Sequence, residues 1–213
     1  MDNLTLYDYL GFVVPGGLVV AAAAYGFDLA PIHAAPSTPG LALLTAAAFV
    51  VGHINAALGN FLQPAAWVHR PGSRLPSSAG LFGRRGLYSA TQQAGIEQHF
   101  ANRFPQADDF QQRFNLGYTE LRQKELDKAA QIMNQQIGFY RNMAAGIVVA
   151  LCVVIVAAIL GHHTLRWWLW VPLGVTGEAL FIFRFRRFWV RFGNEIVRGV
   201  QTLPNDASSS SDA

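Results

Sequence analysis

The chain has 213 residues, of which 52% are hydrophobic and only 14% are charged. Soluble domains carry about 25% charged residues, and a chain of this length cannot bury half of its residues in one aqueous core. The composition therefore excludes an ordinary soluble domain and favours a protein with part of its surface in lipid. The net charge of +3 is small, and no sequence motif of a nucleic-acid-binding module accompanies it, so we expect no nucleic-acid partner.

Four apolar segments are long enough to cross a bilayer core of roughly 30 Å, which takes about 20 helical residues. They cover residues 10–27, 41–62, 143–160 and 165–185. The N-terminal sequence MDNLTLYDY is acidic and lacks the features of a cleavable signal peptide, so we expect the first segment to stay as a membrane anchor. The predicted fold class is an all-α integral membrane protein with four transmembrane helices and a helical cytoplasmic insertion between the second and the third.

Basic residues are distributed unevenly between the connections, which predicts the orientation. The stretch between the second and third segments holds ten Lys and Arg residues, the part from Arg184 at the end of the fourth segment onward holds five, and the last short connection holds only Arg166. Because Lys and Arg are retained on the cytoplasmic side during insertion, we expect both termini to be cytoplasmic in a bacterial inner membrane. The predicted regions are a first transmembrane hairpin (1–62), a cytoplasmic helical region (63–142), a second hairpin (143–185), and a basic juxtamembrane segment with a disordered tail (186–213).

The region between the two hairpins begins with a loop and continues with helices. Residues 63–86 are rich in Pro, Gly, Ser and Arg, a composition that breaks helices. A helix is predicted from Ser89 to Phe104, closed by Pro105, and the Asp108–Asp109 pair is typical of the first turn of another.

Strong helix formers from Tyr118 onward continue without proline into the third apolar segment, so we expect one helix from Tyr118 to Leu160. Apolar and small residues recur there at four- and three-residue steps, a pattern typical of a coiled coil: Leu126, Ala130, Met133, Ile137, Tyr140 and Ala144. Two interpretations stay open. The seam packs against the Ser89–Phe104 helix of the same chain, or it joins copies of the chain through a protruding stalk.

A few residues within the spans are polar or interrupt the helix. Glu178 is the only acidic residue in a span, and ionisable groups there usually face the bundle interior or a water cavity. At 1.5 Å per residue, Glu178 and His53 both lie ~18 Å below the outer face, with Asn60 nearby and Pro15–Gly16 at nearly the same level. Pro15 also frees a backbone carbonyl. We therefore predict an intramembrane polar layer with a Glu178–His53 contact, which serves as a structural hydrogen bond or as part of a proton or ion path.

Arginine alternates with aromatic residues directly after the fourth span, in RFRRFWVRF. Anionic lipid headgroups are the simplest partner for such a segment. The residues predicted to contact lipid headgroups are Arg184, Arg186, Arg187 and Arg191.

The chain carries no sequence pattern of a nucleotide site, a zinc protease, a nucleophile elbow or a redox CxxC pair. The single cysteine, Cys152, cannot form an intrachain disulfide and is expected to be a packed apolar residue. We therefore expect no catalytic residues, no metal site, no cofactor and no enzymatic activity.

The opening YDYLGFVVPGG, together with GHINAALGN in the second span, resembles small bacterial inner-membrane proteins of uncharacterised function. Some relatives of that kind accompany anti-phage defence genes. The resemblance covers the first third of the chain and implies no functional residues. Three functions remain open: a membrane scaffold or adaptor whose cytoplasmic helices bind a soluble protein, an oligomeric pore or membrane-perturbing effector, and a small ion or proton transporter. The partners expected are the lipid bilayer, a second copy of the chain, and a soluble cytoplasmic protein.

Overall fold

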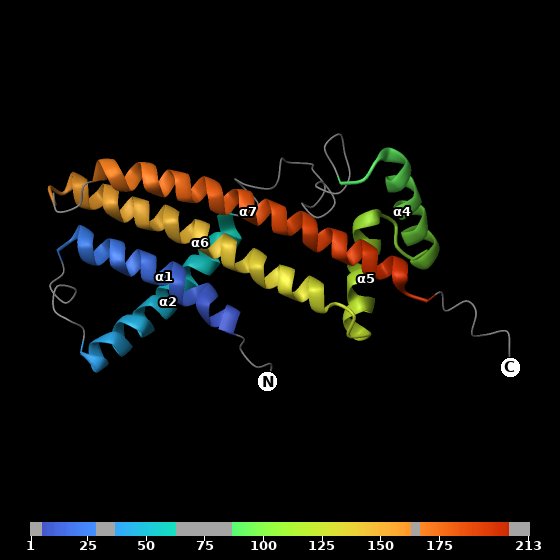
Figure 1. The fold of residues 1–213 in the computed structure, drawn as a ribbon, viewed down its shortest axis with the longest axis horizontal. Helices are drawn as coiled ribbons and strands as arrows, with labels where there is room; N and C mark the ends of the chain where they lie inside the picture. The colour runs from blue at the N-terminus through green and yellow to red at the C-terminus, as the bar shows by residue number, and fades with distance from the viewer. Residues whose placement is uncertain (1–5, 29–36, 63–86, 163–166, 205–213) are drawn as a thin grey trace. The chain divides into compact units, whose positions relative to one another are not determined.

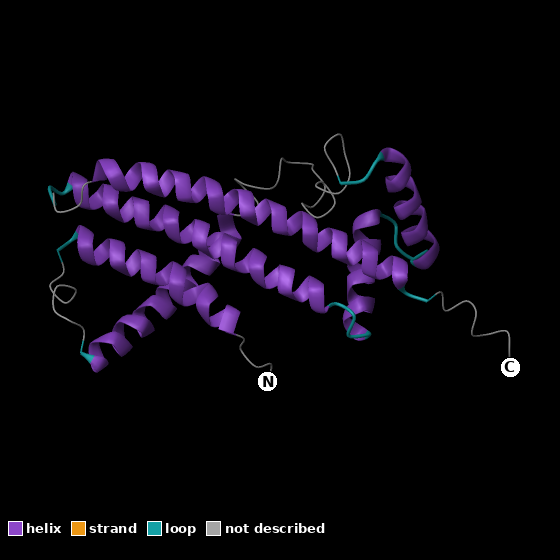
Figure 2. Cartoon of the chain, in the orientation of Figure 1, coloured by secondary structure: helices purple, strands orange, loops and turns teal. Residues whose placement is uncertain are grey.

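The computed structural model describes residues 6–28, 37–62, 87–162 and 167–204 (Figure 1). Helix is the only regular secondary structure in these described ranges, as Figure 2 shows. The helices are α1 (Leu6–Gly26), α2 (Thr38–Leu62), α4 (Ala90–Arg103), α5 (Phe110–Gln123), α6 (Lys128–Ile159) and α7 (Trp167–Thr202). Four of them, α1, α2, α6 and α7, are long and apolar enough to cross a membrane, which confirms the four predicted apolar helices.

The chain divides into two compact units. Unit 1 comprises residues 1–68 and 135–186, and unit 2 comprises residues 69–134 and 187–213. Helices α6 and α7 each contribute one part to unit 1 and another part to unit 2.

In unit 1, the backbones of α1 and α2 touch where two glycines meet the opposite helix. A Cβ on Gly16 would lie 1.8 Å from the carbonyl oxygen of Ala48, and a Cβ on Gly52 would lie 2.0 Å from that of Phe12. Both distances are shorter than any real carbon–oxygen contact, so only glycine fits at these two positions. Small residues permit such close crossings of helices in membranes.

The part of α7 in unit 1 packs against α6 through a glycine- and aromatic-containing face. Gly174 lies against the side chain of Leu151, and Gly177 lies against Ile147. Phe181 follows Gly177 by one turn of α7, and Tyr140 precedes Ile147 by two turns of α6. The rings of Phe181 and Tyr140 lie 5.9 Å apart. These contacts define the α6–α7 hairpin.

Unit 2 has a hydrophobic core of its own, built mainly from large side chains. Its fully buried members include Phe100 of α4, Leu121 of α5, and Ile196 and Val200 of α7. Rings of Phe100 and Phe110 lie 5.3 Å apart, and Phe114 of α5 belongs to the same core.

Both predicted helices of unit 2 are present, but Asp108 and Asp109 precede the second helix and do not form its first turn. Ser89 caps α4 through a capping box with Gln92, and the side chain of Asp109 accepts a hydrogen bond of 2.7 Å from the backbone N–H of Gln112 in α5. Phe104 closes α4, as the following Pro105 led us to expect.

The prediction of one helix from Tyr118 to Leu160 is wrong, because α5 ends at Gln123 and α6 begins at Lys128. Glu125 adopts a left-handed conformation with φ of 55°. The N–H of Leu126 then bonds to the carbonyl of Leu121, and that of Glu125 bonds to Arg122, which is a Schellman motif. Glycine normally occupies the position of Glu125, so the sequence lacks the usual stop signal.

The predicted coiled-coil seam divides between surfaces of different kinds. Ala130, Ile137 and Ala144 are buried within the chain, and Ala130 belongs to the core that also holds Ile96 of α4. Leu126, by contrast, is 60% exposed. Packing within the chain accounts for the buried members. A stalk between copies of the chain stays an untested prediction.

The C-terminal part also differs from the sequence expectation. Helix α7 does not end near Phe185 but continues to Thr202, because Ile196, Val197 and Val200 form part of the unit 2 core. The predicted loop at residues 63–86 and the predicted disordered tail after residue 204 lie outside the described residues.

Candidate functional site

The polar centre of unit 1 forms around Pro15 of α1. Proline has no backbone N–H, so the carbonyl of Gly11, four residues earlier, loses its helical hydrogen-bond donor. The side-chain Nδ2 of Asn142 in α6 donates to this carbonyl at 3.2 Å, and Asn142 is 4% exposed. A buried carbonyl without a donor would be costly in lipid. Asn142 thus satisfies the backbone group that the proline frees.

A second asparagine joins α2 to the same place. Asn55 is 1% exposed, and its Nδ2 donates to the carbonyl of Pro15 at 3.4 Å. Gly146 of α6 lies directly beside them, because a Cβ there would be 3.0 Å from the Pro15 carbonyl oxygen and 3.3 Å from Asn55 Nδ2. The backbone of α1 and the amides of α2 and α6 therefore meet at one point. We call Gly11, Pro15, Asn55, Asn142 and Gly146 the proline node.

The proline node is extended by a half-buried arginine. Nε and one terminal nitrogen of Arg141 lie 3.4 and 3.5 Å from Oδ1 of Asn142, and the stem of Arg141 lies against Gly59 of α2. Since guanidinium nitrogens only donate, this contact assigns the oxygen of the Asn142 amide to Arg141 and its nitrogen to Gly11. The arginine thus orients the amide that serves the α1 carbonyl.

The predicted polar layer is brought together only in part. Pro15 and Gly16 lie at the crossing, as expected, and a freed carbonyl is present. His53 and Asn60 are exposed on α2 instead. His53 Nδ1 lies 2.9 Å from the carbonyl of Phe49, and the imidazole stacks on the ring of Phe12 at 4.0 Å.

The predicted Glu178–His53 contact is not formed as a hydrogen bond. Both carboxylate oxygens of Glu178 are buried, and neither has a hydrogen-bond partner among the described residues. Glu178 lies one turn from Gly174 on the α7 face that packs against α6, whereas Gly52 and Asn55 occupy the inward face of α2 and turn His53 outward. The sequence predicted Glu178 and His53 at the same depth in the membrane, but the two side chains lie on helix faces that do not point toward each other.

The sequence analysis missed Asn142 because it assigned this residue to the end of the cytoplasmic region 63–142. Two signals could have found it. A proline within a span predicts an unpaired carbonyl four residues earlier, and Asn142 shares a helical face with Gly146, where backbones approach closely.

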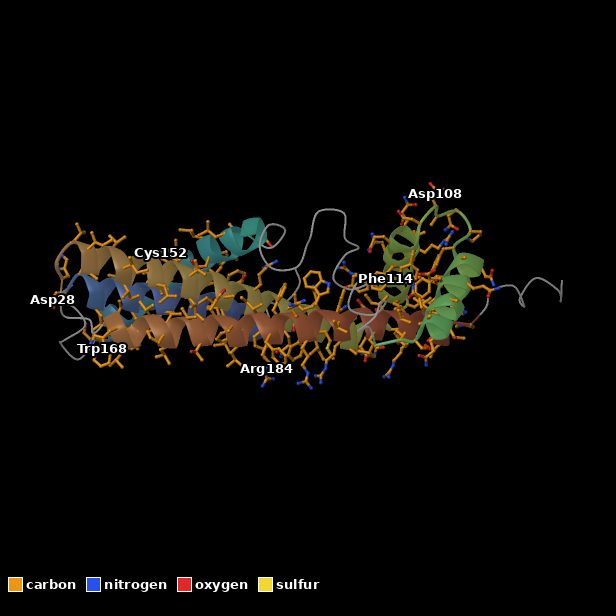
Figure 3. All side chains as sticks on the ribbon, turned by 90° about the horizontal axis from the view of Figure 1, so that it is seen from above. Asp28, Asp108, Phe114, Cys152, Trp168 and Arg184 are labelled. Carbon is orange, nitrogen blue, oxygen red and sulfur yellow. The ribbon has the colours of Figure 1, made fainter. Side chains whose placement is uncertain are left out.

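The four arginines predicted to contact lipid headgroups, at and just after the end of the predicted fourth span, all lie on α7 and are exposed. Figure 3 shows Arg184 on the outer edge of α7. The guanidinium of Arg191 lies 5.7 Å from the centre of the Phe188 ring, which is a cation–π contact. Contact of Arg184, Arg186, Arg187 and Arg191 with lipid headgroups stays a prediction.

Among the described residues of unit 2, an ion pair joins α4 to α5. Arg103 Nε donates to Glu120 Oε2 at 2.9 Å, and Lys124 Nζ lies 2.8 Å from Glu120 Oε1. The hydrogen bonds from Arg103 lower the pKa of Glu120 from 4.5 to about 2. Just before the start of α4, the hydroxyl of Tyr88 donates to Oδ1 of Asn194 in α7.

No group of three or more metal-ligating side chains gathers within the described parts of the chain. Cys152, expected to be packed, is exposed on α6 (Figure 3). No family model, curated protein or solved structure matches this chain.

Proposed function

We propose that this chain is a four-span protein of a bacterial inner membrane that carries unit 2 on the cytoplasmic side as an adaptor for a soluble protein. One observation carries the proposal. Unit 2 has a core of large buried side chains from α4, α5 and α7, whereas the apolar helices of unit 1 keep many large hydrophobic side chains exposed. Such a contrast suits one unit folded in water and another surrounded by lipid.

The orientation rests on charge. Under the proposed topology, fifteen of the sixteen basic residues lie on one side of the membrane, and only Arg166 lies on the other. Lys and Arg near spans are retained in the cytoplasm. The arginine and aromatic residues of α7 suit the cytoplasmic membrane surface, where anionic lipids concentrate. The inner membrane of a bacterium follows from the resemblance of the first two spans to proteins of that compartment.

Crosslinking in living cells tests the adaptor role. A photo-reactive amino acid replaces Leu126 or Ile132, which are 60% and 57% exposed in unit 2. Leu173, which is 62% exposed in the α7 span, is the matched control. We expect an adduct of one discrete mass at a unit 2 position and none at Leu173. Adducts absent from every exposed position of unit 2 would contradict the proposal.

Reconstitution separates the adaptor from a pore. Liposomes that contain the purified chain and an entrapped dye should stay as tight as empty liposomes if the protein is an adaptor. Rapid release of the dye that scales with the protein content would favour a pore-forming effector instead.

A second candidate, ion or proton transport, is favoured by Glu178, whose buried oxygens lack hydrogen-bond partners among the described residues. Intramembrane carboxylates commonly mark ion or proton pathways. Glu178→Gln keeps the shape of the side chain and removes its charge. Transport requires that proteoliposomes with the wild-type chain dissipate a proton or sodium gradient and that Glu178→Gln abolishes this. If neither protein affects the gradient, the transport function is rejected and Glu178 has a structural role only.

A further inference from the structure

The joint between α5 and α6, which we define as residues 124–127, has the local sequence of a helix. It contains neither glycine nor proline, and three of its residues, Lys124, Glu125 and Leu126, are strong helix formers. Opposite charges also recur at helical spacing, since Lys124 lies three residues before Asp127 and Glu125 lies three before Lys128. By its own sequence, the joint should therefore continue α5 directly into α6.

The joint is broken nevertheless, and the break places a residue in an unfavourable conformation. Glu125 has a φ of 55°, in the left-handed region that glycine adopts without steric cost. The N–H groups of Glu125 and Leu126 bond to carbonyls of α5, but a continuous helix would give each of them an equivalent bond. Leu126 is also 60% exposed, so its side chain does little to stabilise the break. Interactions within the joint thus favour a continuous helix.

Contacts outside the joint hold α5 in place. Leu121 of α5 is 2% exposed, and its side chain lies so close to Gly199 of α7 that a Cβ there would be 2.8 Å from it. Glu120 of α5 accepts a hydrogen bond of 2.9 Å from Arg103 of α4. The packing of α5 on its neighbours in unit 2 therefore maintains a break that the joint itself opposes.

The bent and the continuous form exclude each other. Leu121 of α5 and Ala130 of α6 belong to the same hydrophobic core. Each residue turns an α-helix by about 100°, so in one continuous helix these two residues would lie on opposite sides. Only the break allows both to face the core at once. A continuous helix therefore requires that α5 leaves the core.

We infer that the joint is a hinge: α5 and α6 stay bent while α5 packs on α4 and α7, and they join into one continuous helix when α5 is released. Strained backbone is frequent in switch regions, and conflicts between local sequence and structure are expected at such places. The inference concerns unit 2 alone. It goes beyond the proposed adaptor role and does not depend on it.

Release of α5 uncovers apolar side chains of α4 and α7. Gly117 of α5 lies close to Phe100 of α4 and Val200 of α7, because a Cβ there would be 3.2 Å and 2.7 Å from them. Both side chains are fully buried, and water would reach them once α5 leaves. Exposed apolar surface is unfavourable in water, so the bent form dominates while the core is intact. Weaker core packing shifts the population toward the continuous helix.

A distance measurement by pulsed EPR tests the hinge. The full chain carries Cys152→Ser and two spin-labelled cysteines, Asn115→Cys in α5 and Asn134→Cys in α6, both at exposed positions. A continuous helix would separate the two Cα atoms by ~29 Å, at 1.5 Å per residue, and any bend makes this distance shorter. In nanodiscs, the chain with an unaltered core should give a single shorter distance.

Two substitutions should move the population in opposite directions. Leu121→Ala weakens the packing of α5 and should add a component near the distance of the continuous helix. Lys128→Pro should remove that component again, because proline is tolerated at the first position of α6 but breaks a continuous helix. Lys128→Ala is the matched control and should keep the component.

The inference is overturned if Leu121→Ala leaves the distance unchanged, or if the long component persists with Lys128→Pro. A broad distribution without that component would mean that α5 unfolds instead of joining α6. Arg103→Leu decides the matter if Leu121→Ala does not fold. It removes only the ion pair with Glu120 and should give the same long component in a smaller amount, whereas a distance unchanged in this variant as well would overturn the hinge.

Discussion

Unit 1 and unit 2 are held together by different chemistry. In unit 1, helices approach so closely at Gly16 and Gly52 that backbone atoms touch, and two buried asparagines serve carbonyls near Pro15. In unit 2, large side chains such as Phe100 and Leu121 fill the core. Lipid is as apolar as leucine, so burying large side chains gives helices no hydrophobic gain inside a bilayer. The difference is the one expected if lipid surrounds unit 1 and water surrounds unit 2, as proposed above.

Removing a large core side chain should damage unit 2 most. Phe100 is fully buried, and truncation of a buried phenylalanine to alanine costs about 3–5 kcal/mol. We expect Phe100→Ala to unfold unit 2 at a much lower temperature, as followed by circular dichroism in detergent. Gln98→Ala, at an exposed position of α4, is the control. A Phe100→Ala protein as stable as this control would contradict the claim that large buried side chains stabilise unit 2.

Adding a single methyl group should damage unit 1 instead. Gly16→Ala places a Cβ 1.8 Å from the Ala48 carbonyl oxygen, and such overpacking costs about 1–3 kcal/mol or more. The neighbouring Gly17→Ala is the control, since its Cβ would lie 3.9 Å from the nearest atom. Thermal unfolding in detergent should separate the two variants clearly. Similar stability of both proteins would argue against the α1–α2 crossing.

The proline node can be tested by a double-mutant cycle. Asn142→Leu should destabilise unit 1 by ~1–2 kcal/mol, because the Gly11 carbonyl loses its donor. Pro15→Ala restores a backbone N–H that can bond to that carbonyl within α1. The loss on Asn142→Leu should therefore be smaller in the Pro15→Ala background. If the two effects simply add in denaturation experiments, Asn142 does not act through the freed carbonyl.

Acid should weaken unit 2 through Glu120. Its folded pKa of about 2 lies below its ordinary 4.5, so the stabilisation is complete above pH 4.5 and is lost as the pH falls toward 2. Solvent screens this pair in part, so we expect a loss of ~1 kcal/mol. Unfolding of Glu120→Gln should be less dependent on pH in that window. Arg103→Leu, which removes the partner, should flatten the profile in the same way, whereas unchanged slopes would contradict the ion pair.

The smallest expected effect is an increase in the stability of unit 2. Glu125 holds a left-handed conformation at the end of α5, which costs a residue with a side chain roughly 1 kcal/mol. Glu125→Gly should therefore stabilise unit 2 by up to ~1 kcal/mol in thermal unfolding. Glu125→Ala keeps the strain and should give no gain. A destabilised Glu125→Gly protein would place the end of α5 elsewhere.

The sequence was sufficient to predict the apolar helices and the presence of α4 and α5, because hydrophobic length and capping residues act locally. It did not predict the α5–α6 break, since glutamate occupies a position where glycine is the usual signal. It identified Pro15 and its freed carbonyl but assigned the neighbouring polar residues wrongly. Depth along a span can be counted from the sequence, whereas the face that His53 or Asn142 presents depends on how the helices cross.

The central claim is that four helices cross a membrane and that unit 2 lies on the cytoplasmic side. In the Cys152→Ser background, one cysteine replaces Asn115, an exposed residue of α5, and in a second protein one replaces His162, an exposed residue after α6. A membrane-impermeant maleimide applied to cells with a permeabilised outer membrane should label His162→Cys at once, and Asn115→Cys only after the inner membrane is opened. Immediate labelling of Asn115→Cys with protection of His162→Cys would contradict the account.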